Sequence, residues 1–313
     1  MKAYKTTRDL PVEKRLKATA GRLLAVLNPA AAARVYQQPF TRELKYHERL
    51  LRNARQHQAI EERDHETLHQ FLIDYWSSPF SQEFFTTFTH RFEELFLRFH
   101  TDIVVNLAKQ LAALPEHQEV NLVEVGCGDG KVLEYLANQL PRVKHLTGLD
   151  LSEEEIAKCR ERYPSRERMA FTAEDVFDWL EANSDTALVF FTNGGVLEYF
   201  TRRQLERLFV LLRSRPHPTW IALTETLALD HCLDREPETF PYGKELAFSH
   251  NYSALLIESG FQEVWRRDRP TKAGEENHPT RWLQMIAATT AVTSNTNAGN
   301  QSAKPSTPPQ PLS

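Results

Sequence analysis

Three glycines at alternating positions follow an apolar run in the middle of the chain. The run is Val120–Val125, and the glycines are Gly126, Gly128 and Gly130. Glycine lets a backbone turn sharply and lets a ligand approach it closely. The amphipathic stretch that follows predicts a helix whose first N–H groups and positive dipole end face the loop. This arrangement is typical of a site that holds a polar or charged cofactor.

The spacing of these glycines distinguishes between the common cofactors. The dinucleotide-binding fingerprint requires a glycine at position 131, where this chain has Lys131. The phosphate-binding loop is also absent, because no glycine-lysine pair is followed by serine or threonine. Glu124, at the end of the run, would repel a pyrophosphate and attract an ammonium or a sulfonium group. The local chemistry therefore favours S-adenosylmethionine over NAD.

With these features, residues 118–290 resemble the class I S-adenosylmethionine-dependent methyltransferase family. Four segments carry the resemblance, in the family's order and spacing: residues 124–130, 146–152, 171–176 and 190–196. The first is the glycine loop, and the second is a strand that ends in an acid. The third follows the third strand, and the fourth ends the fourth strand. The resemblance implies an enzyme that uses S-adenosylmethionine.

The resemblance also implies a set of cofactor contacts. Asp150 would accept hydrogen bonds from the ribose hydroxyls, and Asp175 and Val176 would contact the adenine. The implied cofactor residues are Glu124, Gly126, Cys127, Gly128, Asp150, Leu151, Asp175, Val176, Thr192 and Asn193. Taken alone, Asp150 could equally be a helix N-cap or a solvated loop acid, while Ser152 and Glu155 could form a capping box.

Polar residues near the later strands are candidates for the methyl acceptor's side of the site. No Asn/Asp-Pro-Pro-Tyr motif, no proline-cysteine pair after the fourth strand and no metal-ligand cluster is evident, so we predict no metal site. The candidate catalytic residues are His250, Glu225 and Tyr199. His250 titrates near neutral pH, which suits a general base, but it could instead be a hydrogen-bonded residue at a helix start. Glu225 could pair with Arg281, and Tyr199 could simply pack.

Periodicity predicts three regions along the chain. Residues 1–115 read as helical, with a phenylalanine stripe from Phe84 to Phe99 that is expected to pack as core. Residues 116–290 alternate strand-length apolar runs with helices, which predicts a doubly wound α/β fold with a seven-stranded, mostly parallel sheet. The predicted strands are 120–125, 145–150, 169–172, 187–192, 220–225, 261–267 and 282–289. Residues 291–313 are polar and proline-rich and predict a disordered tail. The loop 227–247 is expected to form part of the acceptor pocket.

Composition limits the classes of partner. The 313 residues carry a formal net charge of -4, which disfavours a nucleic-acid partner. Three dispersed cysteines, a polar N-terminus and no apolar run of about 20 residues predict a cytoplasmic protein with no membrane partner.

We expect methyl transfer to a small molecule, at oxygen. The alternatives are a protein or RNA methyltransferase, with a basic face on the N-terminal helices, or a non-catalytic scaffold that binds the cofactor. The oligomeric state stays open.

Overall fold

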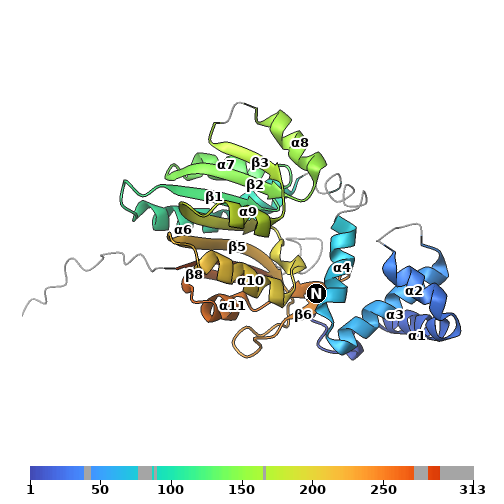
Figure 1. Cartoon of the computed structure of the whole chain (residues 1–313). Coiled ribbons are helices and arrows are strands. Elements are labelled where there is room, and N and C mark those ends of the chain that lie inside the picture. Colours follow the sequence, from blue (N-terminus) through green and yellow to red (C-terminus); the bar gives the residue numbers. More distant parts are fainter. Residues whose placement is uncertain (39–43, 77–86, 88–89, 165–166, 271–280, 290–313) are drawn as a thin grey trace, which may run out of the picture.

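A seven-stranded sheet forms the centre of the molecule (Figure 1). The computed structural model describes residues 1–38, 44–76, 87, 90–164, 167–270 and 281–289. The sheet order is β3-β2-β1-β4-β5-β9-β8, with β1 to β5 parallel and β9 antiparallel to both β5 and β8. The strands are β1 (Val120–Val125), β2 (Val143–Asp150), β3 (Met169–Ala173), β4 (Ala187–Asn193), β5 (Thr219–Leu227), β8 (Gln262–Pro270) and β9 (Arg281–Ala288). The predicted fold class is confirmed.

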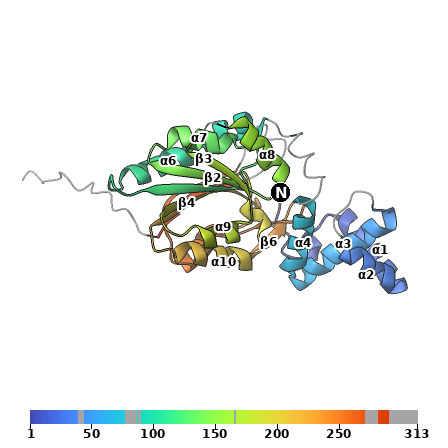
Figure 2. The same cartoon turned by 45° about the horizontal axis from the view of Figure 1, so that its top comes forward.

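Helices cover both faces of this sheet (Figure 2). One face packs against α6 (Thr101–Ala112), α7 (Lys131–Gln139) and α8 (Glu153–Arg162). The other packs against α9 (Val176–Ala182), α10 (Arg202–Arg213) and α11 (Tyr252–Glu258). The central strands are therefore apolar on both sides: in β4, for example, Leu188 and Phe190 face one layer while Val189 and Phe191 face the other.

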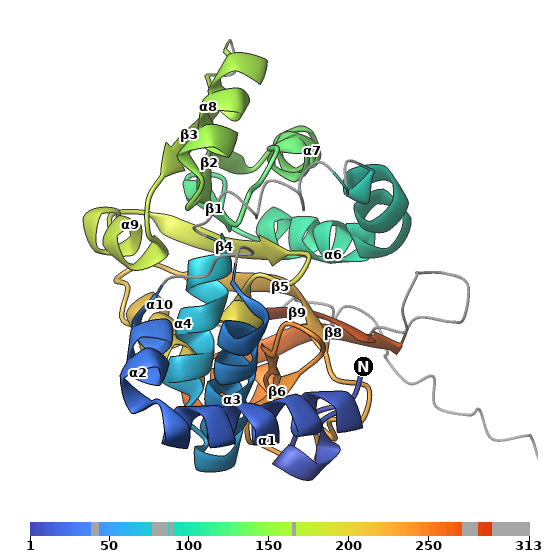
Figure 3. The same ribbon diagram turned by 90° about the vertical axis from the view of Figure 1, so that its right-hand side faces the viewer.

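The N-terminal helices lie together beside the sheet domain (Figure 1), and in the view of Figure 3 they lie in front of its lower part. They are η1 (Thr7–Asp9), α1 (Val12–Leu27), α2 (Pro29–Gln37), α3 (Tyr46–Glu62) and α4 (His65–Trp76). Helix α1 lies close against α3 because Ala18 and Gly21 are small. A Cβ on Gly21 would lie 2.0 Å from the Leu50 carbonyl oxygen. Every helix in the described ranges is too short or too polar to cross a membrane.

The predicted helical region divides between two packing environments. Helix η2 (Phe92–His100), a π-helix, runs directly into α6, and both pack with the sheet rather than with α1–α4. Phe96 is buried there and stacks on Phe92 at 5.6 Å. Phe84, Phe85 and Phe88 of the predicted stripe, like the predicted tail 291–313, lie outside the described residues.

Two short strands and one 3-10 turn complete the fold near the carboxyl ends of β4 and β5. Strand β6 (Phe240–Tyr242) pairs antiparallel with β7 (Ala247–Ser249), and η3 (Leu197–Tyr199) follows β4. The chain start joins this hairpin, because Ala3 forms a β-bridge with Tyr242. The loop 227–247 is thus a packed structure rather than an open segment.

Candidate active site

The glycine loop leaves β1 in a conformation that only glycine adopts easily. Gly126, Gly128 and Gly130 have φ values of 72°, 50° and 75°, all in the left-handed region. The N–H groups of Gly126 and Cys127 donate to the Leu149 carbonyl at 2.8 and 2.9 Å, which ties the loop to the end of β2. A Cβ on Gly126 would lie 2.7 Å from a methyl carbon of Val196. Substitution there would strain both the backbone and the packing.

Asp150 connects the glycine loop to the loop after β2. Its Oδ2 accepts from the Gly128 N–H at 3.1 Å, and its Oδ1 accepts from the Ser152 N–H at 2.9 Å. Burial raises the pKa of Asp150, while these two backbone N–H groups act in the opposite direction. Ser152 itself caps α8 by accepting from the Glu155 N–H at 3.3 Å. Asp150 is therefore a partly buried acid held by two loops, not a solvated loop acid or the cap of α8.

Glu124, near the end of β1, is a buried acid that forms no ion pair within the described ranges. It is 2% exposed, and its Oε2 has no hydrogen-bond partner among the described residues. Burial, followed by the charges of Asp129 and Asp150, raises the pKa of Glu124 well above its usual range. Burying a carboxylate costs free energy unless a positively charged or hydrogen-bond-donating group compensates for the lost water. The ammonium of an amino-acid cofactor is such a group, so these residues fit S-adenosylmethionine.

The other predicted cofactor residues lie around this centre with different exposure. Cys127 and Val176 are buried, while Leu151 is exposed. Asp175 is exposed and caps α9, accepting from the Phe177 N–H at 2.8 Å through Oδ1. Asp175 therefore has a structural role in the described state, and its expected contact with adenine stays a prediction.

At the end of β4, two predicted residues are held by partners from other elements. Thr192 is buried and donates through Oγ1 to Glu225 Oε1 at 2.7 Å. Asn193 Oδ1 accepts from His100 Nδ1 at 2.9 Å. His100 is buried against the Trp282 ring, with centroids 4.6 Å apart, and burial lowers the pKa of His100 to about 3. Sequence reasoning missed His100, whose only signal was its place at the end of the phenylalanine stripe.

Two buried acids lie side by side beyond β4 and β5. Glu225 accepts from Thr192 and, through Oε2, from the Leu197 N–H at 3.0 Å. Glu198 accepts through Oε2 from Thr226 Oγ1 at 2.6 Å and from the Tyr242 hydroxyl. Burial raises the pKa of Glu225 to about 8 and that of Glu198 to about 7. The sequence analysis placed Glu225 among the candidate catalytic residues but not Glu198 or Tyr242, which meet across 44 residues.

On the acceptor side, Arg281 and His250 have other contacts than the pairing and the catalytic role expected of them. The alternative pairing of Glu225 with Arg281 is wrong, because the Arg281 guanidinium bonds Asp268, with Nε 2.8 Å from Oδ1. His250 is fully buried, and both ring nitrogens have partners: Thr239 Oγ1 at 2.9 Å and the Phe200 carbonyl at 3.0 Å. Burial lowers the pKa of His250 to about 3. This arrangement matches the alternative of a hydrogen-bonded histidine at a helix start.

Tyr199, the last residue of η3, packs against α4 of the N-terminal helices. Its backbone carbonyl oxygen lies 2.7 Å from His69 Nδ1, and its ring meets Trp76 edge-on at 5.2 Å. Burial raises the pKa of Tyr199 well above its usual value, which disfavours its phenolate. Tyr199 therefore joins α4 to the segment that carries Glu198.

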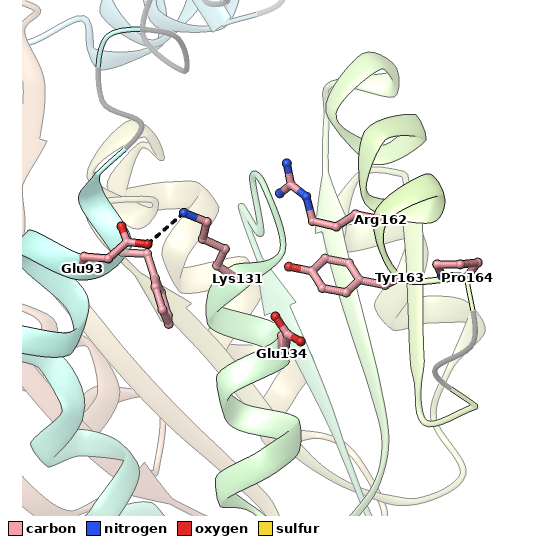
Figure 4. A pocket seen from close by; sticks show the side chains of 7 residues that line it. Glu93, Lys131, Glu134, Arg162, Tyr163 and Pro164 are labelled. Carbon is pink, nitrogen blue, oxygen red and sulfur yellow. Dashed lines mark hydrogen bonds and ion pairs between the residues drawn. The ribbon is translucent and has the colours of Figure 1, made fainter.

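An open cleft of about 560 Å³ adjoins the start of α7 (Figure 4). Lys131 follows the last glycine of the loop and pairs across the cleft with Glu93 of η2 at 3.0 Å. On the opposite wall, Arg162 donates to the Asp129 carbonyl at 2.8 Å. The cleft is lined by Phe92, Glu93, Lys131, Glu134, Arg162, Tyr163 and Pro164. Its polar groups thus fix η2 and α8 against the glycine loop.

Comparison with known proteins agrees with this geometry. Residues 122–215 match a family described as a methyltransferase domain. Malonyl-[acyl-carrier protein] O-methyltransferase of Paenibacillus sp. (strain JDR-2) is 25% identical over 186 residues, covering 53% of this chain and 66% of that protein. Trans-aconitate 2-methyltransferase of Variovorax paradoxus (strain S110) is 30% identical over 96 residues, covering 31% and 36%. The chain thus spans less than two thirds of the length of either relative.

Among solved structures, magnesium protoporphyrin IX methyltransferase from Synechocystis PCC 6803 with bound S-adenosylmethionine is similar at 15% identity. The match covers 71% of this chain and 97% of that one, with a TM-score of 0.45. The family match covers the glycine loop, Asp150 and the end of β4, which are the segments that form the site. Residues 122–215 thus match a methyltransferase domain, in agreement with the resemblance of this region to the class I S-adenosylmethionine-dependent methyltransferases.

Proposed function

We propose that the protein transfers a methyl group from S-adenosylmethionine to an oxygen atom of a small molecule. Two acids around the glycine loop carry the proposal: Glu124, whose buried Oε2 has no hydrogen-bond partner among the described residues, and Asp150, which accepts from the Gly128 N–H. The relatives add support for the acceptor class: one is named an O-methyltransferase, and the other is named for trans-aconitate, a small molecule.

The residues of the glycine loop and its neighbours would hold the cofactor. Glu124 would face the ammonium, and Asp150 would accept from the ribose hydroxyls. Asp175 and Val176 would border the adenine, and Asn193, held by His100, would border the methionine end. When bound, S-adenosylmethionine supplies a methyl group that its sulfonium already activates. The protein must then align the acceptor and exclude water.

Removal of a proton from a hydroxyl acceptor is assigned to the buried acids. Glu198 has a pKa of about 7, which suits a group that gains and loses a proton near neutral pH. Glu225 supports this segment by accepting from the Leu197 N–H, and Tyr199 adjoins Glu198 in η3. His250 would act as a positioning residue, because it binds the carbonyl of Phe200 directly after η3.

The structure removes part of the support for the RNA alternative. Of the basic residues on the N-terminal helices, Arg34, Lys45 and Arg49 are exposed, but two others are engaged within the protein. Arg52 is buried and donates to the Gln38 carbonyl at 2.9 Å, and Arg55 donates to Thr67 at 2.8 Å. Non-specific RNA binding needs solvent-exposed cations that can replace counterions.

Turnover tests the proposal against the scaffold alternative. We expect formation of S-adenosylhomocysteine when the full chain is incubated with S-adenosylmethionine and a panel of organic acids and phenols that includes trans-aconitate. Liquid chromatography with mass detection measures both the product and the position of the methyl group. Cofactor binding with no product from any acceptor would favour the scaffold, and methylation only at nitrogen would contradict the oxygen assignment.

Glu124 makes a separate prediction for cofactor binding. Because its pKa is raised in the free protein, an adjacent ammonium should favour the carboxylate and release a proton. At pH 6 the cofactor's own amino group is already protonated. We therefore expect the heat of binding at pH 6 to vary with the ionisation enthalpy of the buffer, and the affinity to rise with pH.

Glu124→Gln should remove most of this proton release and weaken binding about tenfold or more. Glu153→Gln, at an exposed acid in the first turn of α8, is the matched control and should behave as the wild type. Equal proton release in wild type and Glu124→Gln would show that Glu124 does not face the ammonium.

A further inference from the structure

The surface of α1 carries an apolar stripe that nothing in the described residues covers. Its members are Val12, Leu16, Leu23, Val26 and Leu27, each between 60% and 78% exposed. At about 100° per residue they lie within about 100° of arc on the helix. We call them the α1 stripe. The other large apolar side chains exposed in the described ranges are spread from Met1 to Ile257 over several elements.

The stripe is not the side by which α1 joins the protein. That side carries Ala18 and Gly21, which pack against α3. The α1 stripe lies on the opposite side of the helix, and α1–α3 stand farther from the sheet than α4 (Figure 1). The result is an apolar ridge about 24 Å long at the outer side of the molecule. An exposed apolar surface of this kind indicates an interaction site.

The charge of the surrounding segment limits what can cover the stripe. Residues 1–37 contain eight basic residues and only two acidic ones, a net charge of +6, whereas the whole chain carries -4. The basic residues are Lys2, Lys5, Arg8, Lys14, Arg15, Lys17, Arg22 and Arg34. By helical spacing, Arg15 and Arg22 border the stripe on one edge, where Arg22 also pairs with Glu61. The other edge carries Glu13, which pairs with Lys17. The excess of basic residues in the segment favours a negatively charged partner.

Three other occupants fit these features less well. Pairing with a second copy would bring two segments of the same positive charge together. Single-stranded RNA is bound through aromatic stacking, and the stripe is entirely aliphatic. The chain's own segment 291–313 offers only Val292 and Leu312 as large apolar residues. A fluid anionic surface accepts a convex apolar ridge and places its charges beside the flanking basic side chains.

We infer that α1 docks on an anionic lipid surface, with the α1 stripe in the acyl boundary and Arg15 and Arg22 at the headgroups. Long basic side chains reach the headgroup level while their carbon stems stay among apolar groups. Such a helix lies in the plane of the interface and needs no membrane-spanning segment. The sequence-based expectation of no membrane partner considered only spanning and signal segments, so it did not address this mode of binding.

Vesicle co-sedimentation of the full chain tests the inference. We expect binding to phosphatidylcholine vesicles that contain phosphatidylglycerol, weaker binding at high salt, and little binding to phosphatidylcholine alone. Leu16→Glu combined with Leu23→Glu should lower partitioning at least about tenfold. Both sites are exposed, so the variant should keep the wild-type Tm and cofactor affinity.

Val210→Glu combined with Ile257→Glu is the matched control, because both side chains are exposed on other helices. This control should bind vesicles like the wild type. No binding to anionic vesicles, or equal loss in the control, would overturn the inference. A dimer in sedimentation velocity that Leu16→Glu with Leu23→Glu dissociates would instead assign the stripe to a second copy, and salt-sensitive RNA binding would assign the charge to nucleic acid. Cofactor affinity is measured in parallel, so these outcomes stand apart from the proposed catalysis.

Discussion

Asp150→Ala is expected to weaken binding of S-adenosylmethionine by at least about a hundredfold. The substitution removes the acceptor expected for the ribose hydroxyls. It also removes the carboxylate that holds the N–H groups of Gly128 and Ser152. Hydrogen bonds to a charged group contribute about 1.5–3 kcal/mol each, so losing two of them to the ligand corresponds to roughly 10²–10⁴ in affinity. Isothermal titration calorimetry with S-adenosylhomocysteine measures the change.

Two further variants separate ligand contact from loop geometry. Asp150→Asn keeps the side chain's shape and one acceptor oxygen, so it should retain the fold and lose less affinity than Asp150→Ala. Asp185→Ala changes an acid in an exposed segment before β4, and should leave the affinity unchanged. Wild-type affinity in Asp150→Ala would remove this residue from the cofactor site.

The second large effect concerns stability and pH. Glu225 and Glu198 have pKa values of about 8 and about 7 in the folded protein, above the usual value for glutamate. The folded state therefore binds protons that the unfolded state has already lost. A group with a raised pKa stabilises the fold at low pH and loses that contribution as pH rises through the folded value. We expect the free protein to lose about 2 kcal/mol of unfolding free energy between pH 6.5 and 8.

Over that interval the buried histidines act in the opposite direction, but more weakly. His100 and His250 have pKa values of about 3 in the folded protein, so their stabilising contribution still rises by about 0.4 kcal/mol each from pH 6.5 to 8, as the unfolded histidines lose their protons. Urea denaturation across the interval measures the effect. Glu225→Gln should flatten most of the loss, whereas Glu258→Gln, an exposed acid on α11, should not. A wild-type stability that is constant or rising from pH 6.5 to 8 would contradict the raised pKa values.

The parallel strands were predictable because their signal is local. Strands β1, β4 and β5 are mostly apolar and buried on both faces, while β2 and β3 are only partly buried. Each of the five begins and ends within two residues of its prediction. The hairpin of β6 and β7 was missed because strands of three residues show no periodicity. Their pairing depends instead on contacts with the chain start and with η3.

The site residues also fall into two groups: those that a local sequence pattern indicates, and those that meet only in the folded chain. Glu124, the glycines and Asp150 lie within 27 consecutive positions, and the unit of β1, the glycine loop, α7 and β2 brings them together. His100 meets Asn193 across 93 residues, and Glu198 meets Tyr242 across 44. No local pattern indicates such pairs. His250 could not be assessed from its type alone, because the partners that occupy both of its nitrogens come from distant segments.

Calorimetry on the wild-type chain with S-adenosylmethionine and, separately, with NAD tests the central claim most directly. We expect saturable binding of one S-adenosylmethionine per chain and no heat of binding for NAD. Glu124 would repel the pyrophosphate of NAD, and Lys131 stands where the dinucleotide fingerprint needs its third glycine. Saturable NAD binding together with no heat for S-adenosylmethionine would contradict the assignment of this loop and of the residues around it.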